Sequence, residues 1–173
     1  MTHTFLPLTS FMNTAYLLLG SNLGNRESYL FKAIEMLSAN AGKVQAKSSV
    51  YSTAPWGNTQ QADFLNQAIR IEIPLSAQEL LQKILHIEER LGRKRDQKWE
   101  ARMIDIDILL FNAEIIQTPE LTVPHPFLHE RRFALIPLVD IAGDVMHPIL
   151  NKSIKDLLTE NTDALSVTPA IKS

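Results

Sequence analysis

A short apolar run with two acidic residues constrains this chain more than any other segment. Residues 103–111 read Met-Ile-Asp-Ile-Asp-Ile-Leu-Leu-Phe, and this β-branched, alternating pattern predicts a strand. Because side chains alternate along a strand, Asp105 and Asp107 must share one face, about 6–7 Å apart at Cα, while the isoleucines fill the core. A solvated strand face is the alternative. A pair of Mg²⁺ ligands explains two neighbouring like charges better, because a cation relieves their repulsion.

Composition narrows the classes open to the chain. Its 173 residues suit one domain with a full apolar core, and the absence of cysteine excludes disulfides, thiol catalysis and thiolate metal sites. Seventeen basic and nineteen acidic residues leave a net charge of −2, so no global field favours nucleic acid or an anionic membrane. No segment has signal-peptide character or could span a bilayer, which predicts a cytoplasmic protein. We expect a loose extension over 1–13, one domain over 14–165 and a fraying tail over 166–173.

Hydrophobic periodicity predicts strands alternating with helices. The second helix is the clearest, because Ser76-Ala-Gln-Glu79 forms a capping box and Gly92 provides a stop. Gly20 is expected to end the first strand and open a turn. The expected strands are 15–19, 44–52, 64–73, 103–111 and a brief one at 115–116, and the expected helices are about 25–41, 76–91, 130–136 (with Pro137 disturbing its end) and 153–161.

The polar loop 53–63 and the strand that follows it suggest a ligand pocket. The loop carries Trp56, and in the next strand Phe64 and Asn66 share one face. An aromatic plane beside an amide edge suits a flat heterocycle, which would stack on the ring and hydrogen-bond to the amide. An ordinary cross-strand aromatic beside a satisfied amide explains the pair equally well, and both interpretations remain open at this point.

A basic cluster directly precedes the aspartate strand and favours phosphate binding over a merely solvated loop. His125, which lies between two prolines, and His129 are four residues apart, but no third zinc ligand is evident and a helix is disfavoured at Pro126. The five cations of the cluster are Arg93, Lys94, Arg95, Lys98 and Arg102, with Trp99 among them.

Several short motifs occur in order from about Ala15 to beyond Pro148, and together they resemble the 6-hydroxymethyl-7,8-dihydropterin pyrophosphokinases of folate biosynthesis. One departure is Trp99-Glu100-Ala101-Arg102, where relatives usually carry Gly-Pro between Trp and Arg, so a stiff, uncharged corner has gained freedom and a negative charge. The motifs are Leu19-Gly20-Ser21-Asn22-Leu23-Gly24, Tyr51-Ser52-Thr53-Ala54-Pro55-Trp56-Gly57, Phe64-Leu65-Asn66, Ile87-Glu88, Gly92-Arg93, Arg102-x-x-Asp105-Ile-Asp107-Ile-Leu and Val-Pro124-His125-Pro-x-x-x-x-Arg131-x-Phe133.

The resemblance implies an α+β fold, a ferredoxin-like three-layer α/β/α sandwich around a four-stranded antiparallel sheet. It also implies pyrophosphate transfer from ATP to the pterin hydroxymethyl oxygen, with release of AMP, two Mg²⁺ ions and no nucleic-acid or membrane partner. We expect a monomer. The implied metal ligands are Asp105 and Asp107, and the implied catalytic cations are Arg93 and Arg102. The implied ATP contacts are Glu88, Arg95, Lys98, Trp99, Ile108, Thr122, His125 and Arg131, and the implied pterin contacts are Thr53, Ala54, Pro55, Trp56, Phe64, Asn66 and Phe133.

Two other classes compete with this interpretation. A ferredoxin-like RNA-binding module would use the sheet aromatics and the basic loop, but it would not need paired aspartates on a core strand. A different Mg²⁺-dependent phosphotransferase would keep the aspartates and lose the Phe64, Asn66 and Phe133 set. No general base for the hydroxymethyl proton is evident in the sequence.

Overall fold

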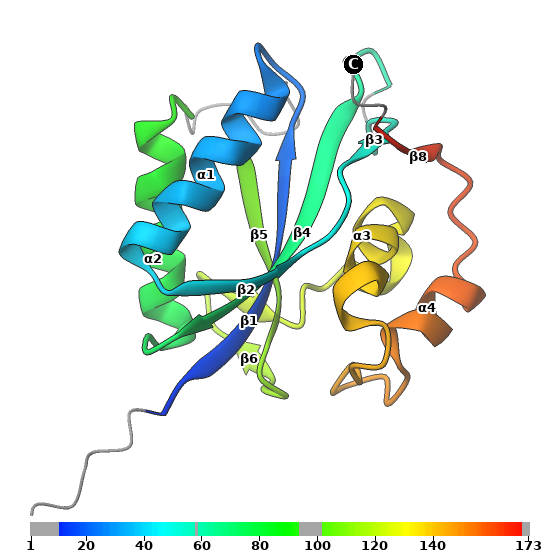
Figure 1. Cartoon of the computed structure of the whole chain (residues 1–173). Coiled ribbons are helices and arrows are strands. Elements are labelled where there is room, and N and C mark those ends of the chain that lie inside the picture. The colour runs from blue at the N-terminus through cyan, green and yellow to red at the C-terminus, as the bar shows by residue number, and fades with distance from the viewer. Residues whose placement is uncertain (1–10, 58, 94–101, 171–173) are drawn as a thin grey trace, which may run out of the picture.

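The computed structural model describes residues 11–57, 59–93 and 102–170, which form three layers (Figure 1). A central antiparallel sheet carries two helices on each face, so the predicted α/β/α sandwich is confirmed. Among the described residues, no helix is long and apolar enough to cross a membrane. Helices α1 (Arg26–Asn40) and α2 (Ala77–Arg90) cover one face, and α3 (Arg132–Ala142) and α4 (Ile154–Glu160) lie on the other.

The sheet has the strand order β5-β1-β4-β3-β8, with β2 beside β3 on the outer edge of β4. Two βαβ units interleave in this order, which is the split arrangement of the ferredoxin-like fold. The strands are β1 (Asn13–Ser21), β2 (Lys43–Lys47), β3 (Tyr51–Thr53), β4 (Phe64–Ile73), β5 (Asp105–Phe111) and β8 (Val167–Pro169); β6 (Ile116–Gln117) and β7 (Thr122–Val123) form a separate hairpin, followed by a 3₁₀ turn η1 (Leu128–Glu130).

The single strand expected over 44–52 is wrong, because the chain forms β2 and β3 with a break between them. At Ser48 the side-chain hydroxyl accepts a hydrogen bond from the Ala68 amide at 2.9 Å, and the Ser48 carbonyl accepts one from the Gln67 side chain at 2.8 Å. The Ser48 amide still donates to the Ala68 carbonyl at 2.9 Å, but side-chain groups supply the other two bonds of the ladder here. The two short strands pair with different parts of β4.

Two expectations about the C-terminal third are also wrong. Helix α3 continues through Pro137 to Ala142, because Leu135, Leu138 and Ala142 are buried against the sheet and α4, which outweighs the hydrogen bond that proline cannot donate. The tail does not fray at Val167–Pro169, since this segment pairs with β3 as strand β8. Local sequence could not reveal that pairing, which joins residues more than a hundred positions apart.

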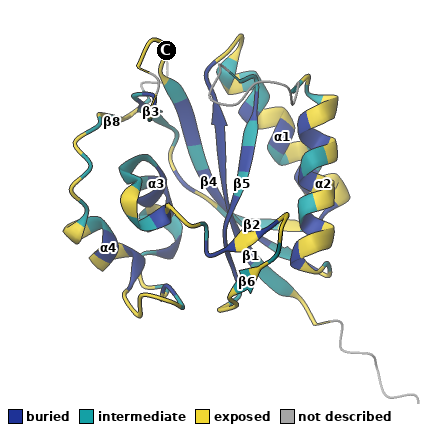
Figure 2. Cartoon of the chain, turned by 180° about the vertical axis from the view of Figure 1, so that it is seen from behind, coloured by how far each residue is buried: buried dark blue, intermediate teal, exposed yellow. Residues whose placement is uncertain are grey.

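Apolar residues form a cluster on each side of the sheet, and Figure 2 shows the buried positions concentrated in the strands and on the sheet-facing sides of the helices. Ile106 and Ile108 of β5 point toward α1 and α2, as the alternation predicts. A register shift against β1 then places both Leu109 and Leu110 in the cluster beneath α3. Asp105 and Asp107 therefore share the α3 side of the sheet.

Candidate active site

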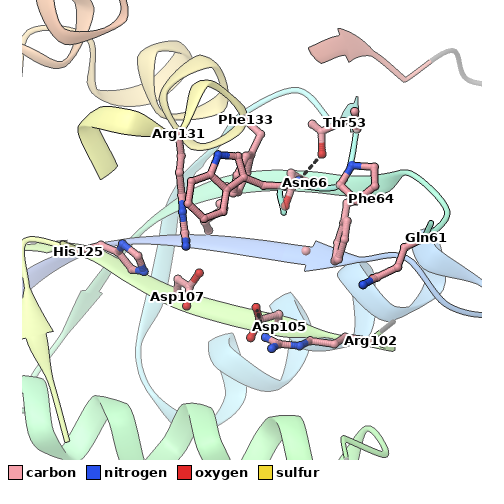
Figure 3. Close-up of a pocket in the computed structure, with 15 residues that line it drawn as sticks. Thr53, Gln61, Phe64, Asn66, Arg102, Asp105, Asp107, His125, Arg131 and Phe133 are labelled. Carbon is pink, nitrogen blue, oxygen red and sulfur yellow. Dashed lines mark hydrogen bonds and ion pairs between the residues drawn. The ribbon is translucent and has the colours of Figure 1, made fainter. Parts of the chain in front are cut away.

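A cavity of about 430 Å³ lies on the α3 side of the sheet, over the end of β1 and the beginnings of β4 and β5 (Figure 3). The register explains this meeting, because Gly20 of β1 pairs with Asn66 of β4 on one side and with Asp105 of β5 on the other. The predicted residues that line the cavity are Thr53, Ala54, Pro55, Trp56, Phe64, Asn66, Phe133, Arg102, Asp105, Asp107, His125 and Arg131.

One wall of the cavity is aromatic and amide-bearing. The Asn66 side chain is only 4% exposed, and its Nδ2 donates a hydrogen bond to Thr53 Oγ1 at 2.7 Å. This bond holds the amide in one orientation beside the Phe64 ring, and Phe133 enters the same cavity from the first turn of α3 (Figure 3). A flat, hydrogen-bonding ligand matches this combination of ring faces and a fixed amide.

The opposite wall carries the two aspartates, and arginines hold Asp105. Its Oδ1 lies 2.8 Å from Arg93 Nη1, and its Oδ2 lies 2.7 Å from Arg102 Nη1. Burial and the charge of Asp105 raise the pKa of Asp107 to about 7, against the opposing influence of Arg131 and Arg102. The repulsion that the sequence predicts between the two carboxylates is therefore a feature of the folded protein.

Glu88 holds Arg93 in place from the other side of β5. Its side chain is 3% exposed; Oε1 accepts a hydrogen bond from the Ile106 amide at 2.7 Å, and Oε2 lies 2.5 Å from Arg93 Nη1. Burial and the Asp105 charge raise the pKa of Glu88 to about 7, although Arg93 and the Ile106 N–H favour the carboxylate. For Arg93, burial opposes the charged form, but Asp105 and Glu88 outweigh it and raise its pKa. Glu88, Arg93 and Asp105 thus form one chain of contacts from α2 to the cavity.

Arg131 supplies a cation among aromatic rings at the α3 end of the cavity. Its guanidinium carbon lies 4.7 Å from the Trp56 ring centre, 5.2 Å from that of Phe127 and 5.6 Å from that of Phe133. Burial lowers the pKa of Arg131, with Asp107 and Asp105 opposing that shift. Arg131 lines the same cavity as Asp105 and Asp107, so a positive and a negative wall face the same ligand volume.

His125 is held as a neutral imidazole beside this cation. Burial and Arg131 lower the pKa of His125 to about 4, with a smaller opposing influence from Asp105. Its Nδ1 accepts a hydrogen bond from the Phe127 amide at 3.2 Å, which assigns the proton of the neutral ring to Nε2. At neutral pH the ring can donate one hydrogen bond into the cavity without adding charge there.

Comparisons with known proteins decide the family. The model of the 7,8-dihydro-6-hydroxymethylpterin-pyrophosphokinase (HPPK) family matches residues 16–143. The chain belongs to this family. The 2-amino-4-hydroxy-6-hydroxymethyldihydropteridine pyrophosphokinase of Aquifex aeolicus is 47% identical over 151 residues, covering 87% of this chain and 94% of that protein. The Bacillus subtilis protein of the same name is 48% identical over 134 residues, covering 77% of this chain and 80% of that protein.

Solved structures of the HPPK family agree with the fold. Wild-type HPPK-DHPS of Plasmodium falciparum superimposes with a TM-score of 0.71 at 17% identity, over 87% of this chain and 42% of that one. The chain therefore spans less than half of that longer protein, and at this identity the likeness concerns the fold alone. Membership of the HPPK family removes the two competing classes, the RNA-binding module and a different phosphotransferase.

The structure does not bring every residue implied by the HPPK resemblance to the cavity. The side chain of Ile108 packs in the core between the sheet and α1 and α2, and Thr122 is exposed on β7. Neither residue lines the cavity, and neither does Glu88 or Arg93, although Arg93 contacts Asp105. The ATP contacts of Ile108, Thr122 and Glu88 and the catalytic role of Arg93 stay predictions. His129 does not line the cavity either, and among the described residues no group of three or more metal-ligating side chains supports the zinc alternative. Arg95, Lys98, Trp99 and the unusual corner Glu100-Ala101 lie outside the described residues.

Three lining residues were missed in the sequence, namely Leu18, Gly20 and Gln61. Gly20 is the informative one, because it lies inside β1 and not in a turn, which corrects the expectation. A Cβ atom there would lie 2.6 Å from Asn66 Oδ1 and 3.6 Å from the Phe64 ring. In the sequence, the only indication was a glycine at the end of an apolar run. That this glycine leaves room for the Asn66 amide becomes evident only from the pairing of β1 with β4.

The paired aspartates suit Mg²⁺ in this HPPK-family site. Within the described part of the chain, no group of three or more His, Asp or Glu residues forms a metal cage. Mg²⁺ does not need one, because it prefers one or two carboxylates together with waters and substrate phosphates. Two carboxylates that face one cavity, with the pKa of Asp107 raised partly by its neighbour, provide that donor set.

Proposed function

We propose that this chain transfers pyrophosphate from ATP to 6-hydroxymethyl-7,8-dihydropterin through the cavity described above. In this reaction the hydroxymethyl oxygen bonds to the β-phosphorus and loses its proton. The bond from that phosphorus to the α–β bridging oxygen breaks, and AMP leaves. The observation that carries the proposal is that one cavity sets an aromatic and amide wall opposite paired aspartates and arginines.

The pterin is assigned to the wall formed by β3, β4 and α3. Phe64 and Phe133 stack on the two faces of the ring, since both enter the same cavity. Asn66, fixed by Thr53, hydrogen-bonds to the ring edge, and residues 53–56 complete that side. Because the amide is already oriented, little rotamer entropy is lost when the ligand binds.

The phosphates are assigned to the opposite wall, where Asp105 and Asp107 hold two Mg²⁺ ions. When bound, Mg²⁺ supplies charge neutralisation across the phosphates and polarises the attacked phosphorus. Arg93 and Arg102 each contact one of the two carboxylate oxygens of Asp105. If Asp105 held Mg²⁺, its oxygens would be shared between the metal and these ion pairs, and the guanidinium groups of Arg93 and Arg102 would become available for the transferring group and for AMP.

The remaining nucleotide contacts are assigned to the side of the cavity near Arg131. Arg131 brings positive charge, and neutral His125 donates a hydrogen bond. Glu88 acts in this proposal through Arg93, whose position it holds. The proposed set of nucleotide contacts is completed by Arg95, Lys98, Trp99, Ile108 and Thr122.

The product nucleotide tests the proposal most directly. Incubation with Mg·ATP and 6-hydroxymethyl-7,8-dihydropterin should yield AMP and the pterin diphosphate in equal amounts, as measured by ion-exchange chromatography and mass spectrometry. Omission of the pterin, or chelation of Mg²⁺, should stop AMP formation. Formation of ADP with a pterin monophosphate, or nucleotide hydrolysis that is indifferent to the pterin, would overturn the assignment.

We also propose that the protein acts as a monomer in the cytoplasm, with no nucleic-acid or membrane partner. A net charge of −2 gives no general attraction for nucleic acid or an anionic membrane, and no helix among the described residues could span a bilayer. Light scattering coupled to size-exclusion chromatography should give a mass near 19.5 kDa. A stable mass of twice that value would contradict the monomer.

A further inference from the structure

A segment that follows α4, residues 161–170, contacts two backbone segments that line the cavity. Figure 1 shows this C-terminal arm running from α4 past α3 to β8, which lies beside β3. From residue 161 to residue 167, every second residue of the arm is partly buried and the residues between are exposed. Such an alternation indicates that one side of an extended chain lies against the protein.

The first contact of the arm is with the start of α3. This helix begins at Arg132, and the side chain of its N-cap residue, Arg131, makes no capping hydrogen bond. Instead, Oδ2 of Asp163, which lies 31 positions further along the chain, accepts a hydrogen bond from the Arg132 amide at 3.1 Å. The Asn161 side chain donates a hydrogen bond to the His129 carbonyl at 3.1 Å. The arm therefore holds the backbone on both sides of Arg131.

Asp163 is itself fixed within the arm. Its amide donates a hydrogen bond to Asn161 Oδ1 at 3.0 Å, and its Oδ1 accepts one from the Leu165 amide at 3.0 Å. Each carboxylate oxygen thus accepts one backbone N–H. A carboxylate suits this position because it offers acceptors alone, and because negative charge is favourable at the start of a helix. Asparagine would keep one acceptor and turn its NH₂ group toward the other amide.

The second contact of the arm is with the segment that carries Thr53. The Ser166 carbonyl accepts a hydrogen bond from the Ala54 amide at 3.0 Å. Strand β8 then pairs with β3 and places Val167 opposite Thr53. Thr53 is the residue that orients the Asn66 amide, through the hydrogen bond of 2.7 Å. One arm therefore joins the start of α3 to the strand that fixes the amide of the pterin wall.

We infer that Asp163 is a positioning residue that sets the distance between the rings of Phe133 and Phe64. The inference rests on the proposed function, in which these rings stack on the two faces of the pterin. Carbon atoms in contact lie about 3.5–4.0 Å apart, so a flat ring between two others needs a spacing of about 7–8 Å. A gap of about 0.5–1 Å already forfeits about a quarter to a half of the attraction.

The two rings differ in how they are held. Phe64 belongs to β4 and is fixed by the pairing of that strand with β3. Phe133 belongs to the first turn of α3, which lies between the Asp163 cap and the buried side chain of Leu135. Leu135 anchors the helix in the core, and Asp163 fixes the turn that precedes it. Loss of the cap should therefore displace Phe133 more than Phe64.

Calorimetry of pterin binding tests this role. The affinity for 6-hydroxymethyl-7,8-dihydropterin is measured in the presence of Mg²⁺ and an ATP analogue that has a methylene group in place of the α–β bridging oxygen, so that no transfer occurs. Asp163→Ala should weaken this affinity about 5-fold, within the range that one aromatic contact contributes. In turnover with ATP, the KM for the pterin should rise by a similar factor and kcat should change less than about two-fold, because stacking is lost equally in the ground state and the transition state.

The affinity for the ATP analogue alone provides an internal control. Arg131 has anchors that do not depend on the arm, since its amide donates a hydrogen bond to the Leu128 carbonyl at 3.3 Å and its guanidinium carbon lies 4.7 Å from the Trp56 ring centre. Asp163→Ala should therefore leave the affinity for the analogue within about two-fold of the wild type, as expected for an independent site.

A double-mutant cycle with Phe133 separates positioning from a general loss of stability. If Asp163 acts through the Phe133 ring, adding Asp163→Ala to Phe133→Ala should change pterin affinity less than about two-fold. Asp156→Ala is the matched control, because this carboxylate accepts a hydrogen bond from the Ser153 hydroxyl at 2.6 Å at the start of α4 and does not line the cavity. It should leave pterin affinity unchanged. Asp163→Asn should weaken pterin binding by a smaller factor and is the readout if Asp163→Ala does not fold.

Wild-type pterin affinity in the folded Asp163 variants would overturn the inference. An equal loss in Asp156→Ala, an equal loss for the ATP analogue, or the full loss on top of Phe133→Ala would overturn it too. Each of these results is compatible with formation of AMP and pterin diphosphate by the wild type. If the wild type binds the pterin and Asp163→Ala weakens that binding as expected, but the wild type makes no AMP, the proposed function fails and the positioning role of Asp163 stands.

Discussion

The two faces of the central sheet use the same strands for different purposes. Toward α1 and α2, strand β5 presents Ile106 and Ile108 to a continuous apolar core. Toward α3, the same strand presents Asp105 and Asp107 to a cavity. Further along β5, apolar side chains return on that face at Leu109 and Leu110, which share a buried cluster with Leu135 of α3.

This difference teaches where a layered fold leaves room for chemistry. Helices α1 and α2 bury one face, and packing there sets stability. On the other face α3 packs against β4 and only a few residues of β1, so the ends of β1, β4 and β5 stay open to a ligand. Polar side chains on those open strand ends displace few buried apolar contacts, so they can bind ligands without a large loss of stability. Substitutions on the two faces should therefore have separable effects.

The sharpest test on the cavity face is Asp107→Asn. We expect turnover with Mg·ATP to fall at least about 1000-fold, because loss of a metal ligand removes several kcal/mol of transition-state stabilisation. The free energy of unfolding of the metal-free protein at pH 7, measured by urea denaturation, should not decrease. The folded state raises the pKa of the Asp107 carboxyl to about 7. The ionised carboxylate is therefore less favourable in the folded than in the unfolded protein, and the free energy of unfolding falls as the pH rises toward 7. Asparagine has no charge, so it removes this destabilisation. Unchanged turnover would contradict the metal assignment.

Asp105→Asn is the companion substitution and should behave differently in stability. It should lose turnover to a similar extent. Because Arg93 and Arg102 each lose an ion-pair partner at 2.8 Å and 2.7 Å, it should also lower the free energy of unfolding. Equal stability of the two variants would mean that these ion pairs contribute nothing to the ligand-free protein.

Ile71→Ala examines the core face. Ile71 is fully buried on β4 toward α1 and α2, so the substitution should lower the free energy of unfolding by about 3 kcal/mol through lost burial and a residual cavity. Turnover per folded molecule should stay within about two-fold of the wild type. Ile71→Val, as the milder control, should cost about 1 kcal/mol. A tenfold loss of turnover in fully folded Ile71→Ala would break the separation between the two faces.

Gly20→Ala probes the smallest residue of the cavity face. The new Cβ would lie 2.6 Å from Asn66 Oδ1, so the amide must move, and pterin affinity should weaken about 10-fold, or about 1.4 kcal/mol. Nucleotide affinity should change less than about two-fold. Gly143→Ala, outside the cavity and 3.3 Å from the nearest atom, is the control. Calorimetry that shows equal losses for both ligands would contradict the assignment of this wall to the pterin.

His147 tests whether a buried polar group outside the cavity serves stability alone. Its Nδ1 accepts hydrogen bonds from the Ile149 and Leu150 amides at 3.3 Å and 3.2 Å, so the ring must be unprotonated at that nitrogen. Burial and His129 lower the pKa of His147. A lowered pKa means that the contribution to stability is present above the unfolded value of about 6.5 and is lost as the pH falls below it.

We therefore expect His147→Asn to reduce the loss of unfolding free energy between pH 7.5 and pH 5.5 by about 1 kcal/mol, the usual worth of a hydrogen bond. His86→Asn, at an exposed position on α2, should leave that loss unchanged. Turnover at pH 7.5 should be unaffected by either substitution. Identical pH dependence in the wild type and His147→Asn would show that this histidine does not titrate with folding.

Local sequence determined the parts of this protein that depend on neighbouring residues. Strand alternation predicts that Asp105 and Asp107 share a face, and the structure confirms it. The capping box at Ser76 and Glu79 predicts the start of α2, and both of its hydrogen bonds form. Phe64 and Asn66 follow the same alternation into the cavity. Short-range geometry decides these features, because a residue two or three positions away is always nearby.

Tertiary structure alone decided the features that depend on pairing register and packing. Gly20 matters for the cavity because β1 places it opposite Asn66 of β4. Asn22 hydrogen-bonds to Gln61 and Arg102, which are 39 and 80 positions away in the chain. The chain of contacts from Glu88 to Asp105 needs α2 packed against β5. Strand β8 needs β3 as its partner. No local propensity specifies such contacts, because their free energy arises only when the core has already brought distant segments together.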